Sequence, residues 1–196
     1  MTRLSKIEIQ KLESKLSTWF QPKDMLTCFR QISNDIGSEV FFNQAGLAFL
    51  RDAYIGAKFG KIRNANKVRL ITENQPDFEI IINKTTMKFE ATEVLRKGRR
   101  RGSEYQPKCT GEVVFCSPDE LEVDEEQILQ SIKDAINNKN KRYYPPDTHL
   151  IAYVNIPFIM WYDRDSILTR LKKYTQSQCI QFQSVWILWN DRVDKL

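Results

Sequence analysis

The spacing of hydrophobic residues along this chain changes after Gly60, and the change limits the folds that the chain can adopt. Up to Gly60, hydrophobic residues recur at helical spacing, which predicts three helices. From Val68 onward, short hydrophobic runs alternate with turns and with two further stretches of helical spacing, which predicts strands and helices. The expected order is helices, three strands, helix, strand, helix, strand. A central mixed β-sheet flanked by helices accommodates this order, so we predict an α/β fold.

Three helices are predicted in the N-terminal part of the chain. The first begins with Ser5, which opens a capping-box pattern. Pro22 suits the first turn of the second helix, and Gly37 is expected to end it. We interpret residues 1–42 as a helical extension packed on the core and residues 43–196 as the α/β domain.

Five strands and two further helices are predicted after the N-terminal helices. The helices are expected to begin at Asp124 and at Asp165, which are good N-cap residues. The segment 113–116 fits either a short extra strand or a packed loop. The predicted strands cover residues 68–71, 77–83, 87–95, 149–156 and 184–189.

Two carboxylates stand in the second and third predicted strands. Pro76 and Asp77 open one strand, and Glu90 and Thr92 lie on the strand that follows the next tight turn. Side chains two residues apart on a strand share a face, so Glu90 and Thr92 are expected to point the same way. In a regular hairpin register, Asp77 approaches Glu90 across the strand pair.

A pair of carboxylates held together in this way favours a cation between them. Mg²⁺ commonly binds through one or two carboxylates together with water and substrate phosphate, and Mn²⁺ accepts the same oxygen ligands. A bound cation lowers the pKa of a coordinated water and neutralises the charge that develops on a phosphate. The carboxylate pair therefore indicates metal-dependent phosphodiester hydrolysis.

This segment resembles the motif of the PD-(D/E)XK nucleases, the superfamily with the restriction-endonuclease-like fold. Pro76-Asp77 matches the PD of the motif, and Glu90-Ala91-Thr92 matches its (D/E)-x-K in position. The predicted order αβββαβαβ also matches the core of that fold, so the resemblance covers roughly residues 43 to 190. It implies a restriction-endonuclease-like core, a Mg²⁺ or Mn²⁺ ion held by Asp77 and Glu90, and endonuclease activity on nucleic acid, with DNA as the expected substrate and RNA as the alternative.

One position departs from the family pattern, because Thr92 stands where the family has a lysine that positions or activates the attacking water. Either another group supplies this role or the site is inactive. Lys139 is a candidate, since it lies about 20° from Ile128 on a helical wheel and extends the apolar stripe of its helix. The alternative is a lysine that snorkels at the end of a packed helix. Glu93 is a weaker candidate, because its strand phase points it away from Glu90 unless a bulge intervenes.

A basic loop follows the third predicted strand directly. Glycines keep the loop pliable, and arginines bind phosphates through two parallel hydrogen bonds. We interpret it as a loop that holds the substrate backbone without sequence preference. The alternative is a solvated loop, or one that pairs with the acidic run 119–126. Its five cations are Arg96, Lys97, Arg99, Arg100 and Arg101.

Composition narrows the class of protein. The formal net charge of +5 favours a polyanionic partner. No hydrophobic stretch approaches the roughly 20 residues that span a bilayer, and the charged N-terminus does not resemble a signal peptide, so a cytoplasmic protein with no membrane partner is expected. The four cysteines form no C-x-x-C pair, and His149 is the single histidine. Reduced thiols and no zinc site are therefore expected.

Three hypotheses of function follow. The first is a metal-dependent endonuclease with Asp77, Glu90, Thr92 and Lys139 at its catalytic site. The second is a nuclease-fold subunit that has lost catalysis and binds nucleic acid or assembles with a partner protein, which Thr92 in place of lysine favours. The third is an interaction protein that makes no contact with nucleic acid. The apolar stripes of the N-terminal helices fit a homodimer interface or a docking surface as well as they fit simple core packing.

Overall fold

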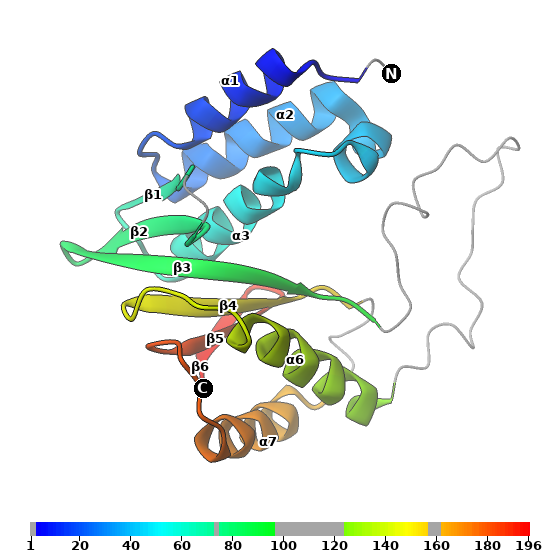
Figure 1. Ribbon diagram of the computed structural model, residues 1–196, viewed down its shortest axis with the longest axis vertical. Helices are drawn as coiled ribbons and strands as arrows, with labels where there is room; N and C mark the ends of the chain where they lie inside the picture. The colour runs from blue at the N-terminus through cyan, green and yellow to red at the C-terminus, as the bar shows by residue number, and fades with distance from the viewer. Residues whose placement is uncertain (1–2, 73–74, 97–123, 157–161) are drawn as a thin grey trace, which may run out of the picture. The chain divides into compact units, whose positions relative to one another are not determined.

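The structure is a computed structural model that describes residues 3–72, 75–96, 124–156 and 162–196 (Figure 1). In these ranges the chain forms five helices and six strands, and the strands make one mixed sheet in chain order. The predicted α/β class with a mixed sheet is therefore confirmed. The strands are β1 (Lys67–Leu70), β2 (Phe78–Ile82), β3 (Thr85–Val94), β4 (Thr148–Val154), β5 (Val185–Trp189) and β6 (Arg192–Lys195).

The described residues divide into two compact units. The first unit ends at Ala91, and the second begins at Thr92, so the boundary falls within β3. The first unit contains the three N-terminal helices with β1, β2 and most of β3, and the second contains the remaining elements. None of the helices in the described ranges has the length and hydrophobicity needed to span a membrane.

The N-terminal helices are α1 (Lys6–Leu16), α2 (Pro22–Asn43) and α3 (Ala48–Ile62). α1 begins with the predicted capping box, in which the Ser5 side chain accepts the N–H of Glu8 and the Glu8 carboxylate accepts the N–H of Ser5. α2 begins at Pro22 as predicted. Gly37, which was expected to end this helix, interrupts it without ending it. Gly37 has φ 72° and ψ 159°, which makes a kink, and the helix resumes as far as Asn43.

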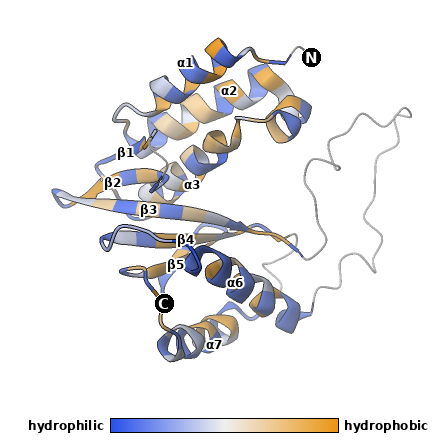
Figure 2. Ribbon diagram, in the orientation of Figure 1, coloured by the Kyte–Doolittle hydropathy of each residue, from blue (hydrophilic) through white to orange (hydrophobic). Residues whose placement is uncertain are grey.

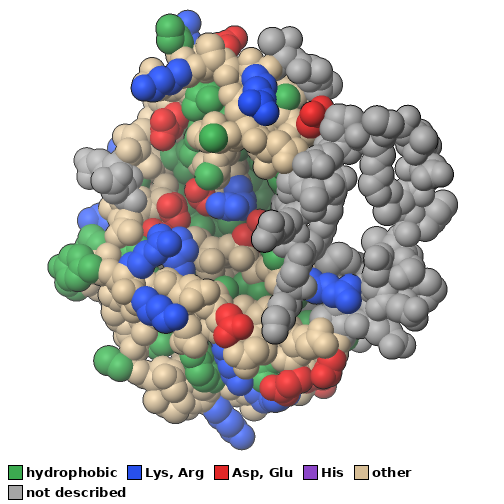
Figure 3. Space-filling view, turned by 45° about the vertical axis from the view of Figure 1, so that its right-hand side comes forward, with side chains coloured by type: hydrophobic (Ala, Val, Ile, Leu, Met, Phe, Trp, Pro, Cys, Tyr) green, Lys and Arg blue, Asp and Glu red, His purple; other side chains and the backbone are tan. Residues whose placement is uncertain are grey.

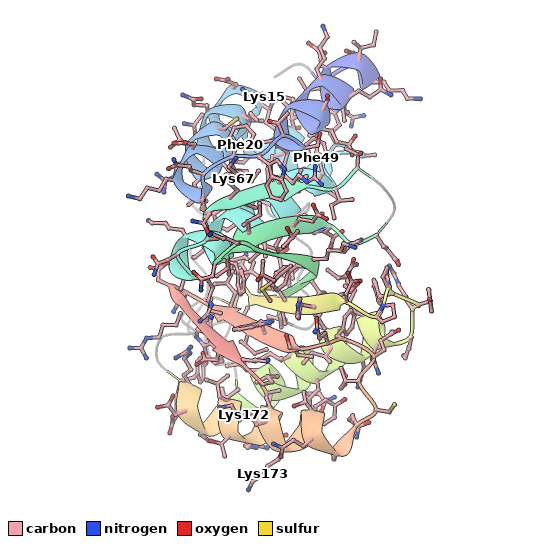
Figure 4. All side chains as sticks on the ribbon, turned by 90° about the vertical axis from the view of Figure 1, so that its left-hand side faces the viewer. Lys15, Phe20, Phe49, Lys67, Lys172 and Lys173 are labelled. Atoms are coloured by element: carbon pink, nitrogen blue, oxygen red, sulfur yellow. The ribbon has the colours of Figure 1, made fainter. Side chains whose placement is uncertain are left out.

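The first three strands form the predicted antiparallel meander. β2 and β3 are joined by a two-residue turn at Asn83 and Lys84, which have φ values of 49° and 68°. Positive φ at both central residues matches the right-handed twist of a hairpin. Phe20 extends this sheet beside β1, because it exchanges two main-chain hydrogen bonds of 2.9 Å with Val68 (Figure 4).

The second unit contains α6 (Glu125–Asn140) and α7 (Arg164–Ser177). Asp124 caps α6 as predicted, whereas α7 is capped by Asp163 and not by Asp165. The predicted stripe of Ile128, Ile132 and Ile136 is fully buried, and it joins the core that the parallel strands β4 and β5 supply. Figure 2 shows that the side of α6 turned toward the viewer is mainly hydrophilic.

The last strand, β6, was not predicted. It pairs antiparallel with β5 after a turn in which Asn190 has a φ of 53°. Its residues are mostly charged and partly exposed, as is common for an edge strand. The pattern of alternating hydrophobicity that indicates a strand is therefore missing from this segment, and pairing with β5 determines its conformation.

Candidate functional site

The β2–β3 hairpin holds Asp77 and Glu90 on neighbouring stretches of backbone. The register pairs Phe78 with Phe89. The main-chain N–H of Asp77 donates to the carbonyl oxygen of Phe89 at 3.0 Å, and Oδ2 of Asp77 accepts the N–H of Ala91 at 2.7 Å. Asp77 therefore binds the backbone on both sides of Glu90, whose side chain is 3% exposed.

Aromatic packing behind the hairpin determines which way the carboxylates face. The rings of Phe78 and Phe89 are stacked, with centroids 5.5 Å apart and an interplanar angle of 11°, and Phe89 also lies 5.0 Å from the ring of Phe59 on α3. A Cβ added to Gly56 of α3 would lie 2.9 Å from the Phe78 ring, so α3 packs closely on these rings. Because side chains alternate along a strand, the residue before Phe78 and the residue after Phe89, which are the two carboxylates, are directed away from α3.

A third carboxylate in the same hairpin is already neutralised. Glu79, which is 8% exposed, forms an ion pair of 2.7 Å with the Arg69 guanidinium on β1. The guanidinium also lies 4.6 Å from the centre of the Trp19 ring. The register places Lys88 opposite Glu79 on the other side. Cationic neighbours therefore account for Glu79 without a bound metal ion.

Thr92 and Lys139 line a single groove in the second unit. The groove has a volume of about 540 Å³, and its walls are the C-terminal end of β3 and the hydrophilic side of α6. Lys139 occupies the last turn of α6 and is half-buried, so it lies beside the buried isoleucine stripe without being part of it. Its polar and charged lining residues include Thr92, Glu93, Gln130, Asp134, Lys139 and Arg142.

Glu93 is engaged by an asparagine that the sequence pattern did not single out. Nδ2 of Asn155 donates to Oε1 of Glu93 at 2.7 Å, and the main-chain N–H of Asn155 donates to the carbonyl oxygen of Val94 at 2.9 Å. Asn155 directly follows β4, so it ties the end of that strand to the end of β3. The signal that could have identified it is an asparagine immediately after a buried hydrophobic run.

The predicted phosphate-binding loop falls mainly outside the described residues. Arg96 is described and half-buried, whereas Lys97, Arg99, Arg100 and Arg101 lie outside the described ranges, as does the segment 113–116. The role proposed for the loop therefore stays a prediction from the sequence.

The donor set at the hairpin fits a small, hard cation. In the described ranges, no group of three or more His, Cys, Asp or Glu side chains is arranged to hold a metal ion. A cation bound by Asp77 and Glu90 would therefore take most of its remaining ligands from water and from a phosphate. Mg²⁺ commonly binds in this way, whereas structural Zn²⁺ and tightly held Ca²⁺ need more protein ligands.

Comparison of the chain with known protein families, with curated proteins and with solved structures found no match. The resemblance to the PD-(D/E)XK nucleases therefore depends on the motif residues and on the order of elements. The function is therefore inferred from the chemistry of the side chains in the β2–β3 hairpin and in the groove beside α6.

A serine and a histidine in the second unit are hydrogen-bonded to each other, as in the catalytic dyad of a hydrolase, but both are buried in the core. Nδ1 of His149 lies 2.7 Å from Oγ of Ser184, and Nε1 of Trp186 donates to the same Oγ at 2.8 Å. The indole can only donate, so one lone pair of the serine oxygen is occupied by Trp186, and the direction of the bond to His149 depends on the tautomer of the imidazole. Both His149 and Ser184 are buried, so we assign the pair to the core.

The buried histidine gives the protein a pH-dependent stability. Burial lowers the pKa of His149, the positive charge of Lys195 lowers it further, and Asp147 opposes the shift. Below about pH 6.5 the unfolded chain binds a proton at this position more readily than the folded chain does. The free energy of unfolding is therefore expected to decrease as the pH falls from about 7.5 to 5.5.

His149→Gln tests this expectation in urea unfolding at several pH values. The chain has one histidine, so few other groups titrate in this range and the variant should show a flatter pH dependence than the wild type. Equal pH dependence in both proteins would contradict the assignment.

Proposed function

We propose that this chain is a divalent-metal-dependent nuclease, a divergent relative of the PD-(D/E)XK nucleases, with DNA as its expected substrate. The observation that supports the proposal is the pair of hydrogen bonds at Asp77, whose N–H donates to Phe89 and whose carboxylate accepts from Ala91, on both sides of Glu90. They keep two carboxylates adjacent on a rigid hairpin, and a metal site needs ligands that are held in place before the metal binds.

The order of elements gives separate support. Among the described residues, the elements from α3 onward run α3, β1, β2, β3, α6, β4, α7, β5, which is the order αβββαβαβ of the restriction-endonuclease-like core. We propose that this segment forms such a core, with α1, α2 and β6 as additions to it.

In this proposal Asp77 and Glu90 hold Mg²⁺ or Mn²⁺. When bound, the cation supplies charge neutralisation at the phosphate and a lowered pKa for a coordinated water. The N–H of Ala91 orients the Asp77 carboxylate. Thr92 supplies a hydroxyl group to the groove and Lys139 an ammonium group, which is the chemical group that the family lysine provides. The basic loop holds phosphates through Arg96, Lys97, Arg99, Arg100 and Arg101.

The second candidate function is a nuclease-fold subunit without catalysis, which binds nucleic acid or assembles with a partner protein. Thr92 at the position of the family lysine favours it, because a threonine hydroxyl carries no positive charge. Lys139 beside Thr92 in the groove favours the active enzyme instead. The two candidates therefore differ in whether the chain cleaves nucleic acid, and binding of nucleic acid is compatible with both.

A cleavage assay separates them. The full chain is incubated with labelled DNA and RNA, single-stranded and double-stranded, in Mg²⁺, in Mn²⁺ or in a chelator. We expect cleavage that requires the cation. Tight binding without cleavage would assign the second candidate. Absence of binding even at low salt, where phosphate contacts are strongest, would overturn the nuclease and leave of the second candidate only the subunit that assembles with a partner protein.

A further inference from the structure

The end of α6 exposes an aromatic ring to solvent. Among the described residues, the exposed large hydrophobic side chains are Ile7, at 65%, and Tyr143, at 82%. A tyrosine ring in water leaves unburied a large apolar surface that usually packs in a core or an interface. Tyr143 lies three residues after the end of α6 at Asn140 and is preceded by the exposed cations Lys141 and Arg142.

The backbone on both sides of Tyr143 is fixed. The side-chain amide of Gln181 donates to the carbonyl oxygen of Arg142. On the other side, Tyr144 is buried, with its ring centroid 4.8 Å from that of Phe182. Tyr143 is thus presented on a rigid support, so little conformational entropy is lost when a flat ligand covers the ring.

Three cationic residues, Lys139, Lys141 and Arg142, precede Tyr143 within four positions of the sequence. Lys139 and Arg142 line the groove beside α6, and Lys141 is exposed at the helix C-cap. The groove also contains Glu93 and Asp134, and each accepts a hydrogen bond from a neighbouring amide side chain. The cationic side chains of Lys139 and Arg142 are the part of the groove lining suited to an anion.

The helix dipole does not explain this arrangement. A cation in the last turn of a helix interacts favourably with the dipole, which accounts for Lys139. Arg142 lies beyond the C-cap, and a dipole gives no reason to expose Tyr143. Proteins that bind unpaired nucleic acid, in contrast, combine solvent-exposed aromatic rings with cations. A base stacks on the ring while the cations contact the phosphates.

We propose that the C-terminal end of α6 binds an unpaired stretch of nucleic acid, with Tyr143 stacked on one base and Lys139, Lys141 and Arg142 on the phosphates of that strand. This inference rests on the proposed nuclease function and narrows its substrate to nucleic acid that has unpaired bases. Bases inside a duplex are covered by their neighbours, so a duplex has no free base face for Tyr143.

The affinity of the full chain for labelled single-stranded DNA and for a duplex of the same length tests the proposal. The measurement is made in a chelator, which prevents metal-dependent cleavage. We expect tighter binding of the single strand. Tyr143→Ala should weaken single-strand binding about tenfold, which is within the range for loss of one base–aromatic stack. Tyr143→Phe should bind as the wild type does, because the ring remains.

The salt dependence distinguishes the ring from the cations. Arg142→Ala should lower the slope of log K against log salt by about 0.7, the value for one phosphate contact on a single strand. Tyr143→Ala should leave the slope unchanged, because it removes no charge. The matched control is Lys173→Ala, which removes the same charge from an exposed position on α7 (Figure 4), and it should leave both affinity and slope unchanged.

Equal affinity for single strand and duplex, or single-strand affinity that Tyr143→Ala does not change, overturns the proposal. Thermal unfolding of each variant shows that the fold is intact, as expected for changes at exposed positions. Cleavage is scored separately. A wild type that cleaves, with a Tyr143→Ala variant that binds normally, refutes the stacking site alone. Binding that depends on Tyr143 in a chain that never cleaves refutes the nuclease chemistry alone.

Discussion

Asp77→Asn and Glu90→Gln are each expected to reduce metal-dependent cleavage by at least about 10³-fold. A bound cation contributes several kcal/mol of charge stabilisation in the transition state, and about 4 kcal/mol corresponds to 10³-fold in rate. Both substitutions remove a negative charge and keep the shape of the side chain. The amide oxygen introduced by Asp77→Asn can still accept the N–H of Ala91, so the hairpin keeps its hydrogen bond while the metal loses its ligand.

Metal binding can be measured independently of cleavage. Mg²⁺ or Mn²⁺ that binds the folded chain raises its melting temperature, and the increase grows with the logarithm of the metal concentration once that concentration exceeds Kd. We expect this increase in the wild type and its loss in Asp77→Asn and Glu90→Gln. A protein whose melting temperature responds to metal but which does not cleave would have the site without the chemistry, as the second candidate function requires.

Glu79→Gln is the matched control for both measurements. It removes the same charge from the same hairpin, at a residue that already pairs with Arg69. We expect cleavage and metal stabilisation close to those of the wild type, with some loss of stability because the buried ion pair is broken. An equal loss of cleavage in all three variants would mean that the hairpin as a whole matters, and the specific ligand pair would be refuted. Cleavage that survives Asp77→Asn and Glu90→Gln would refute the site.

The sequence predicted the fold best where local pattern and packing agree. Ser5 caps α1 by a contact made within four residues, and Asp124 does the same for α6. The isoleucines of α6 recur every four residues and are all buried. These features need no information from distant parts of the chain, and the pattern of hydrophobic residues contains them.

The sequence predicted the fold poorly where a distant partner decides. Glycine often ends a helix, because it tolerates positive φ. At Gly37, however, the helix is kinked and then resumes. β6 has no alternating pattern, and its pairing with β5 makes it a strand.

The candidate sites follow the same rule. Strand alternation and one tight turn were enough to expect Asp77 near Glu90. The contact of Asn155 with Glu93, in contrast, joins residues 62 positions apart. The exposure of Tyr143 depends on the packing of the rest of the chain, which the local sequence does not indicate. On the face drawn in Figure 3, acidic and basic side chains lie side by side, so the net charge of the chain did not indicate a particular surface.

The proposed metal ligands depend on the aromatic layer beneath them. Phe78 follows Asp77 and Phe89 precedes Glu90, and the two rings are stacked against each other. Burial of these rings therefore determines the position of both carboxylates. A mutation in this layer should affect stability first and metal binding as a consequence.

Phe89→Ala is expected to lower the free energy of unfolding by about 3–5 kcal/mol, the usual cost of truncating a fully buried phenylalanine. The ring has no solvent exposure and contacts both Phe78 and Phe59, so its removal leaves a cavity that close-packed neighbours fill incompletely. Domains of this kind are stable by about 5–15 kcal/mol, so the loss is a large share of the total. Urea unfolding measures it.

Phe89→Leu is the control, because it keeps most of the buried volume and should cost clearly less than Phe89→Ala. A double-mutant cycle with Phe78→Ala isolates the stacking contact, for which about 0.5–1.5 kcal/mol of coupling is expected. A loss below about 1 kcal/mol for Phe89→Ala would be typical of a surface position and would contradict the packing described here. Because Phe89→Leu leaves both carboxylates in the chain, any loss of metal stabilisation in that variant would measure how far the aromatic layer positions them.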